Sequence, residues 1–172
     1  METWDAIRAR RDVRQYTDQP LTREQLERIL EAGRRSPSSS NWQPWDFVVV
    51  TDRAELAELS KVWSHAGQVA DSAATVALVA PVSAGDPQYR ERAMYDLGQA
   101  TMSIMLAAAD LGIGSGHTAV TDQDLARALL GFSDDRFCAY LIPLGCPADR
   151  PLAPIARPNR RPFDEVVHWG RW

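Results

Sequence analysis

Arginines near the two ends of the chain are the first residues whose type and spacing point to chemistry. The chain carries 19 cationic side chains, and all of them except Lys61 are arginine. A guanidinium binds phosphate through parallel N–H donors and keeps its charge. Two clusters could therefore converge on one phosphate, although arginines near termini are also often simply solvated. The clusters are Arg8, Arg10, Arg11 and Arg14 at one end, and Arg157, Arg160 and Arg161 at the other.

A polar segment with two prolines offers a second kind of chemistry. Residues 36–45 read Ser-Pro-Ser-Ser-Ser-Asn-Trp-Gln-Pro-Trp. The amides of Asn41 and Gln43 each provide a donor and an acceptor. They suit the edge of a heterocycle with alternating donors and acceptors, such as the pyrimidine ring of a flavin. The same residues also suit a plain helix-to-strand connection that uses serine and asparagine in its turn, and the segment alone favours neither interpretation.

Other catalytic classes find little support in the sequence. His65, His117 and His168 are scattered without metal-ligand spacing, so we expect no metal site. Serines 38–40 lack the G-x-S-x-G setting of a hydrolase nucleophile. Residues 114–119 match the G-x-G-x-x-A dinucleotide pattern, but they follow a helical pattern and lead into a strand, which is the wrong order. An enzyme without an evident acid, base or nucleophile points to a cofactor that carries the chemistry.

Length and composition predict one soluble globular domain. The chain has 172 residues, 45% hydrophobic and 24% charged, which suits a single core. Its net charge of −4 disfavours nucleic acid as a partner. The longest uncharged stretch, residues 72–85, is too short and too polar for a membrane span, and the N-terminus lacks a secretion-signal pattern. Cys138 and Cys146 do not form a disulfide framework, so we expect a cytoplasmic protein.

Helical and strand patterns must position these side chains. Thr22 and Gln25 form a capping-box pattern that begins a helix ending near Gly33. Apolar periodicity predicts a long central helix, and continuous apolar runs predict buried strands. Since helices and strands do not alternate strictly, we predict a three-layer α+β domain. The expected helices are 4–10, 22–33, 54–63, 88–111 and 121–130, and the expected strands are 45–51, 75–80 and 137–144, with a glycine-rich strand or loop over 113–120.

The C-terminal segment, residues 147–172, predicts an arm rather than a further core element. It is rich in proline and ends in Val-Val-His-Trp-Gly-Arg-Trp. Exposed valine and tryptophan at such density would promote aggregation unless they were covered. A partner subunit would cover them.

Five segments, in order along nearly the whole chain, together resemble the flavin-dependent nitroreductase family. Residues 10–14, Arg-Arg-Asp-Val-Arg, resemble its R-R-S-[VI]-R opening, and residues 36–45 resemble its A-P-S-x-x-N-x-Q-P-W loop. Residues 96–115, from Asp-Leu-Gly to Leu-Gly-Ile-Gly-Ser, are similar to its central helix and the turn after it. Residues 144–147, Leu-Gly-Cys-Pro, and 160–167, Arg-Arg-Pro-Phe-Asp-Glu-Val-Val, resemble its L-G-x-P strand end and its basic tail.

The resemblance implies a fold, an assembly and an activity. The fold is a three-layer α/β/α sandwich with a mainly antiparallel central sheet, in a single domain over residues 1–172. The assembly is a homodimer in which the arm, about residues 148–172, crosses to the partner, with one FMN per subunit at the interface. By a ping-pong mechanism, NADH or NADPH would reduce the flavin and a small acceptor, such as a nitroaromatic or a quinone, would then be reduced in the same place. A flavin-binding module without reductase activity and a specialised biosynthetic dehydrogenase stay open as alternatives.

The resemblance also assigns residues to the flavin phosphate and to the flavin ring. Arg14 would face the N1–C2 carbonyl edge, where a fixed cation stabilises the negative charge that develops on reduction. The residues assigned to the phosphate are Arg10, Arg11 and Asp12, joined by Arg160 or Arg161.

Two loops supply the remaining positions. The partner subunit would contribute Pro37, Ser38 and Ser39, together with Arg35. The residues expected near the ring or the ribityl chain are Asn41 and Gln43, and those expected to present backbone groups near the flavin face or N5 are His117, Thr118 and Ala119.

Three departures from the family pattern bear on the site. Asp12 stands where the family has serine, and a carboxylate beside a phosphate weakens binding unless Arg11 or Arg14 neutralises it. The pair Gly116-His117 replaces a small residue followed by an aromatic one, which alters the substrate face. Residues 81–87 are too few for the helical roof that often covers the site, so we expect an open pocket.

Overall fold

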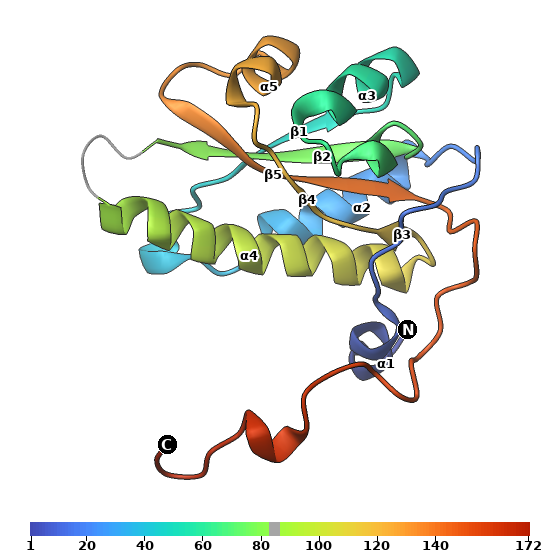
Figure 1. Cartoon of the computed structure of the whole chain (residues 1–172), viewed down its shortest axis with the longest axis vertical. Helices are drawn as coiled ribbons and strands as arrows, with labels where there is room; N and C mark the ends of the chain where they lie inside the picture. The colour runs from blue at the N-terminus through green and yellow to red at the C-terminus, as the bar shows by residue number, and fades with distance from the viewer. Residues whose placement is uncertain (83–86) are drawn as a thin grey trace.

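A sheet of five antiparallel strands lies between two pairs of helices (Figure 1). The computed structural model describes residues 1–82 and 87–172. Neighbouring strands follow the order β1-β2-β5-β3, and β4 also pairs with β5. The strands are β1 Asp46–Val50, β2 Ala74–Pro81, β3 Gly114–Ser115, β4 Thr118–Ala119 and β5 Arg136–Gly145. The helices are α1 Thr3–Ala9, α2 Arg23–Arg34, α3 Arg53–Leu59, α4 Pro87–Asp110 and α5 Gln123–Leu130.

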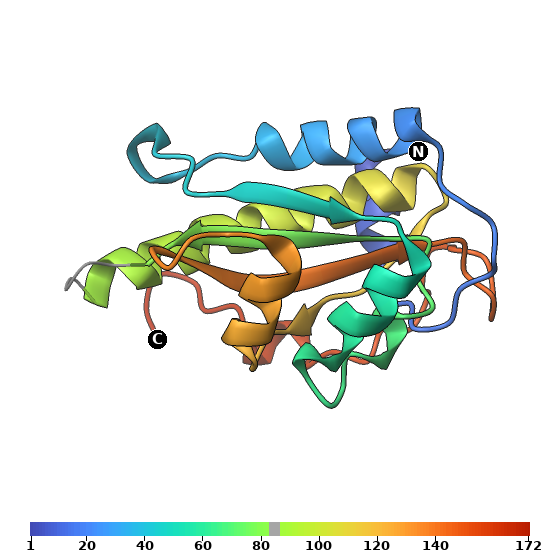
Figure 2. The same cartoon turned by 90° about the horizontal axis from the view of Figure 1, so that it is seen from above.

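The central strands contribute side chains to two separate hydrophobic cores, one on each face of the sheet. Successive strand residues point to opposite faces of a sheet, so β2 gives Val76 and Leu78 to one core and Ala77 and Val79 to the other. Helices α2 and α4 cover the first face and α3 and α5 cover the second, as Figure 2 shows. The predicted three-layer α+β sandwich with an antiparallel sheet is confirmed, and the need to be apolar on both faces explains the unbroken apolar runs of β2 and β5.

Local sequence signals fix the two helices of the first core. The capping box is present: Gln25 N–H donates to Thr22 Oγ1 at 3.2 Å, and Thr22 N–H donates to Gln25 Oε1 at 2.8 Å. At Gly33 a Cβ would lie only 2.8 Å from Ile104 Cγ1, so the glycine lets α2 approach α4 closely. Helix α4 has 24 residues, close to the predicted 88–111.

Some expected boundaries differ from the structure. The predicted helix 54–63 ends as an α-helix at Leu59 and continues as a 3-10 turn, Ser60–Val62. The segment 113–120 forms the two short strands β3 and β4, and no helix begins directly after its glycines, in agreement with the rejection of a dinucleotide fingerprint. Within the described residues, no helix is long and apolar enough to cross a membrane. The expectation of a missing roof over 81–87 concerns residues that lie mostly outside the described part of the chain.

The N-terminal segment after α1 adds to the edge of the sheet. Asp12 forms a parallel bridge with Ser115, and Tyr16 forms an antiparallel bridge with Pro147. Two glycines make this possible, since a Cβ at Gly114 would lie 2.8 Å from Val13 Cγ2 and one at Gly145 would lie 2.7 Å from the Tyr16 ring. The backbone of residues 12–16 is therefore held against the sheet rather than free as a loop.

The chain leaves this edge as an arm. Ala148 N–H donates to the Gln15 carbonyl at 3.0 Å, and Ile155 N–H donates to the Arg8 carbonyl at 3.0 Å. Beyond that point the arm extends away from the sandwich (Figure 1). Its large apolar side chains are uncovered, with Trp169 84% and Trp172 100% exposed.

The close approach of Tyr16 to Gly145 gives a test of the packing. Gly145→Ala should lower the free energy of unfolding by about 1–3 kcal/mol, because the new methyl overlaps the Tyr16 ring. Gly67→Ala is the matched control: its Cβ would meet no atom within 4 Å, so its effect should stay within about 0.5 kcal/mol. Urea denaturation at one fixed protein concentration measures both. Equal stabilities for the two variants would contradict the packing described.

Candidate functional site

Two adjoining cavities lie where the N-terminal segment meets β3, β4 and β5. The larger has a volume of about 550 Å³ and the smaller about 370 Å³, both within the range of small-molecule sites. His117 and Tyr140 line both cavities and form the wall between them. The larger cavity is also lined by Asp12, Arg14, Trp63, His65, Gly67, Gln68, Thr118 and Ala119, and the smaller by Arg10, Met94, Gly98, Thr101, Met102 and Met105.

The extended backbone of residues 10–14 decides which side chains reach the cavities. In an extended segment alternate side chains point the same way. Arg10, Asp12 and Arg14 accordingly line the two cavities, whereas Val13 packs on Gly114. Asp12 is paired with Arg10, with Nη1 3.1 Å from Oδ1. Arg10, rather than Arg11 or Arg14, is therefore the arginine paired with this carboxylate, because residues 10 and 12 share one side of the extended segment.

Arg11 points away from the cavities and holds the start of the arm. Its Nη2 donates to Asp149 Oδ1 at 2.7 Å and to the Arg150 carbonyl at 2.8 Å. The hydrogen bond from Arg11 lowers the pKa of the Asp149 carboxyl. In the single chain, Arg11 is thus engaged by the start of the arm.

The segment from the break after β3 through β4 lines the larger cavity with His117, Thr118 and Ala119. Thr118 pairs with Leu141 and Ala119 with Tyr140 across to β5. The Thr118 side chain is buried, and its Oγ1 has no hydrogen-bond partner among the described residues. A buried hydroxyl without a partner costs about 1–3 kcal/mol. It is a natural contact for a polar group of a bound ligand.

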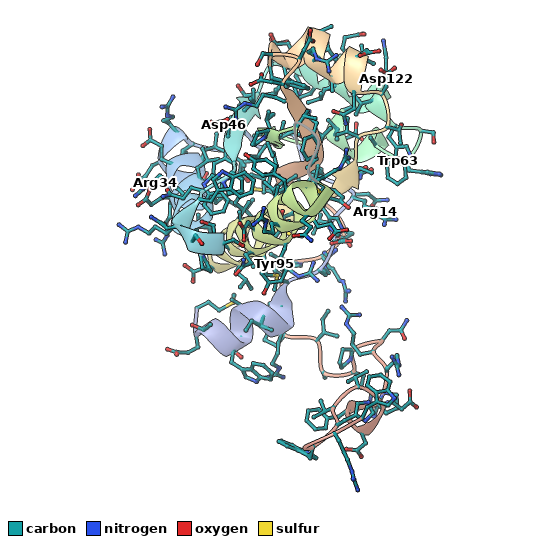
Figure 3. The ribbon with its side chains drawn as sticks, turned by 90° about the vertical axis from the view of Figure 1, so that its left-hand side faces the viewer. Arg14, Arg34, Asp46, Trp63, Tyr95 and Asp122 are labelled. Atoms are coloured by element: carbon teal, nitrogen blue, oxygen red, sulfur yellow. The ribbon has the colours of Figure 1, made fainter. Side chains whose placement is uncertain are left out.

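The sequence did not indicate the far wall of the larger cavity. Trp63, His65 and Gln68 come from the irregular segment after α3, and Tyr140 comes from a strand that its pattern assigned to the core. Trp63 and His65 meet edge to face, with ring centroids 4.9 Å apart. Figure 3 shows Trp63 and Arg14 on the same side of the domain. No local sequence pattern predicts this wall, because it forms only when the segment after α3 folds beside β4 and β5.

The polar loop 36–45 is held by a buried aspartate of α4. Asp96 is fully buried and accepts the Ser39 N–H on both oxygens, at 3.1 and 3.0 Å, as well as the Ser39 hydroxyl at 3.2 Å. The loop backbone is left-handed at Ser40, Asn41 and Gln43, with φ of 50°, 57° and 53°. Such φ values are unfavourable for residues other than glycine. The loop therefore needs a fixed anchor, and Asp96 provides one.

The loop 36–45 does not line either cavity of its own chain. It starts at the end of α2, and Figure 3 shows Arg34 on the side of the domain opposite Arg14. Arg35 pairs with Glu31 at 2.6 Å, and the side chains of Asn41 and Gln43 are exposed.

The basic residues of the arm also stay apart from the N-terminal arginines. Arg160 donates to the Asn159 carbonyl at 2.7 Å, and Arg161 Nε lies 3.4 Å from Glu165 Oε2. The arm leaves the domain before these residues (Figure 1). The two arginine clusters do not converge within one chain.

Comparison with known proteins agrees with the fold. The chain belongs to the nitroreductase family, whose model matches residues 7–84 and 63–146. A protein of Archaeoglobus fulgidus, provisionally described as an NADH dehydrogenase/NAD(P)H nitroreductase, is 33% identical over 83% of this chain and 84% of its own. An NADH dehydrogenase of Thermus thermophilus is 26% identical over 93% of this chain and 92% of its own. The structure of an NADPH:FMN oxidoreductase from Vibrio harveyi in complex with NAD+ is 26% identical, with a TM-score of 0.85 over 97% of this chain and 76% of that one.

The anchor of the loop 36–45 can be tested on stability. Asp96→Asn keeps the shape of the side chain but replaces one acceptor oxygen with an amide N–H donor. This donor would face the Ser39 N–H and hydroxyl, which also donate. The variant should therefore lower the free energy of unfolding by about 1–3 kcal/mol. Asp134→Asn, at a side chain 95% exposed, should change it by less than about 0.5 kcal/mol. Urea unfolding followed by tryptophan fluorescence measures both. An Asp96→Asn variant as stable as the control would rule out the anchoring role.

Proposed function

We propose that the protein is a homodimeric oxidoreductase that binds FMN in the cavity pair and uses NADH or NADPH as electron donor. The observation that carries this proposal is the placement of Arg14, Thr118 and the neighbouring Arg10 around the adjoining cavities. Membership of the nitroreductase family supports it. So do the names of the similar proteins from Vibrio harveyi, an NADPH:FMN oxidoreductase, and Thermus thermophilus, an NADH dehydrogenase.

The residues present fit FMN on three counts. The cavity volumes of about 550 and 370 Å³ suit a cofactor-sized ligand. The buried Thr118 hydroxyl has no partner among the described residues, and it belongs to a residue that lines the larger cavity. Arg10 and Arg14 supply fixed positive charge for a phosphate and for an electron-rich ring edge. Together these groups match an anionic ligand with a polar heterocycle.

The chain's own residues would orient the cofactor and stabilise charge. FMN held there would supply the redox chemistry: hydride acceptance from NADH or NADPH and, in a separate half-reaction at the same place, transfer of two electrons to a small acceptor such as a nitroaromatic or a quinone. Arg10 would hold the phosphate, and Arg14 would face the N1–C2 edge. A preorganised cation at that edge stabilises the negative charge that develops there. His117, Thr118 and Ala119 would contact the ring through the broken edge between β3 and β4.

A second copy of the chain would complete the site. The loop 36–45 lies on the side of the domain opposite Arg14, and the arm carries uncovered tryptophans. Both features are accounted for if each chain lends its loop and arm to the cavities of the other. The partner would lend Pro37, Ser38 and Ser39 from the loop, together with the preceding Arg35. Asn41 and Gln43 of the same loop would lie near the ring or the ribityl chain, and Arg160 or Arg161 of the arm would join the phosphate.

The first test is spectroscopic. Purified protein mixed with FMN should give a bound-flavin spectrum, and anaerobic NADH or NADPH should bleach it, because the bound flavin is then reduced. A panel of nitroaromatics and quinones should restore the oxidised spectrum. A bound spectrum that does not bleach with either nucleotide would indicate a flavin-binding module instead, and no bound flavin at all would contradict the proposal.

The role of Arg14 gives a second test. Arg14→Gln should slow the bleaching of bound flavin by about 10- to 100-fold, because the cation that stabilises the reduced form is lost. Arg14→Lys should slow it much less, since the charge is kept. Single-turnover stopped-flow at saturating NADPH separates this rate from flavin affinity. If Arg14→Gln and the unaltered protein bleach at the same rate, Arg14 has no such role.

A further inference from the structure

Two positions at which this chain departs from its family's pattern lie close together in the lining of the larger cavity. His117 Nδ1 lies 3.8 Å from Asp12 Oδ1. Arg10 Nη1 lies 3.1 Å from the same oxygen atom. One carboxylate oxygen is therefore shared between a guanidinium that is always charged and an imidazole that is charged only when protonated.

The surroundings of His117 leave Asp12 as its acidic neighbour among the groups that line the cavities. Arg14 and His65 line the larger cavity with it, Arg10 lines the smaller one, and the Tyr140 ring lies at a centroid distance of 6.0 Å. Tyr16, behind this wall, stays neutral because burial raises the pKa of its hydroxyl well above the usual value. A change of charge on His117 is thus felt mainly by Asp12 and by the two cavity arginines.

The shared oxygen limits what Arg10 can do for an anion. While Asp12 is paired with Arg10 alone, the negative charge of Asp12 cancels much of the attraction between Arg10 and a phosphate. A protonated His117 provides a second cation beside Asp12, so that the charge of Arg10 becomes available to the phosphate. Histidine is the side chain whose charge ordinarily changes between about pH 5 and pH 8.

We propose that His117 is the counter-cation of Asp12, and that its protonation releases Arg10 to bind the phosphate of the flavin. The inference rests on the proposed function and adds a positioning role for His117 and a pH dependence to it. Asp12, in place of a serine, weakens binding when His117 is neutral, and His117 in its cationic form offsets this. Cofactor affinity therefore carries a component that strengthens as the pH falls.

The test is a double-mutant cycle on the dissociation constant of FMN, measured by quenching of flavin fluorescence. The variants are Asp12→Ser, His117→Phe and the double variant, each at about pH 6 and about pH 8. His117→Phe should weaken binding by about two- to fivefold at the lower pH and little at the higher one, as expected for a half-exposed ion pair. With serine at position 12, the same replacement should have little effect at either pH. Asp12→Ser should tighten binding, and more so at the higher pH.

Two controls isolate the effect. Asp124→Ser, at an exposed site on α5, should leave the dissociation constant unchanged. Riboflavin, which lacks the phosphate, should show no coupling between positions 12 and 117. The second ionisation of a phosphate, near pH 6, affects every variant alike and cancels in the cycle.

The outcomes separate two kinds of failure. If the protein binds FMN but the two replacements are additive at both pH values, or if Asp12→Ser loosens binding, the pairing of Asp12 with His117 has no part in cofactor affinity and the inference is overturned. If no variant binds FMN at either pH, the proposed function fails and the inference falls with it. Coupling that appears with FMN at the lower pH and is absent with riboflavin is the expected result.

Discussion

The contact of residues 12–16 with the glycine edge of the sheet is the constraint on which the site depends. Val13 and Tyr16 lie so close to Gly114 and Gly145 that any side chain at either glycine would overlap them. This contact fixes the position and the direction of the extended N-terminal segment relative to the sheet. Arg10, Asp12 and Arg14 then point to the cavities, while Arg11 points to the arm. The charged lining of the cavities is thus a consequence of backbone packing.

The same contact links the site to the arm. Arg11 pairs with Asp149 at the beginning of the arm, and Tyr16 bridges to Pro147 just before it. The arm therefore leaves the domain beside the cavities, but its apolar end is uncovered in the single chain. A chain that lends its arm to a second copy would place that second copy next to the site, as the proposed dimer requires.

Much of the fold could be predicted from local chemistry. The capping box at Thr22, the apolar stripe of α4 and the two-faced strands β2 and β5 each follow from a short pattern that tertiary packing does not oppose. Of the candidate site, the resemblance identified Arg10, Arg14 and residues 117–119, which do line the cavities. The pairing of Asp12 with Arg10 could not be predicted from the sequence, because the direction of alternate side chains in residues 10–14 depends on their pairing with β3. Trp63, His65, Gln68 and Tyr140 were missed because they are brought together only by the folded chain.

The central claim is that the flavin site is shared between two chains, since the loop 36–45 lies opposite the cavities of its own domain. Sedimentation velocity over a dilution series, recorded in the visible absorbance band of the flavin, tests it most directly. The account predicts that flavin absorbance travels only with a species of twice the chain mass of 19.1 kDa, and that dilution to monomer releases free FMN. Flavin that sediments with the 19.1 kDa monomer would contradict the shared site.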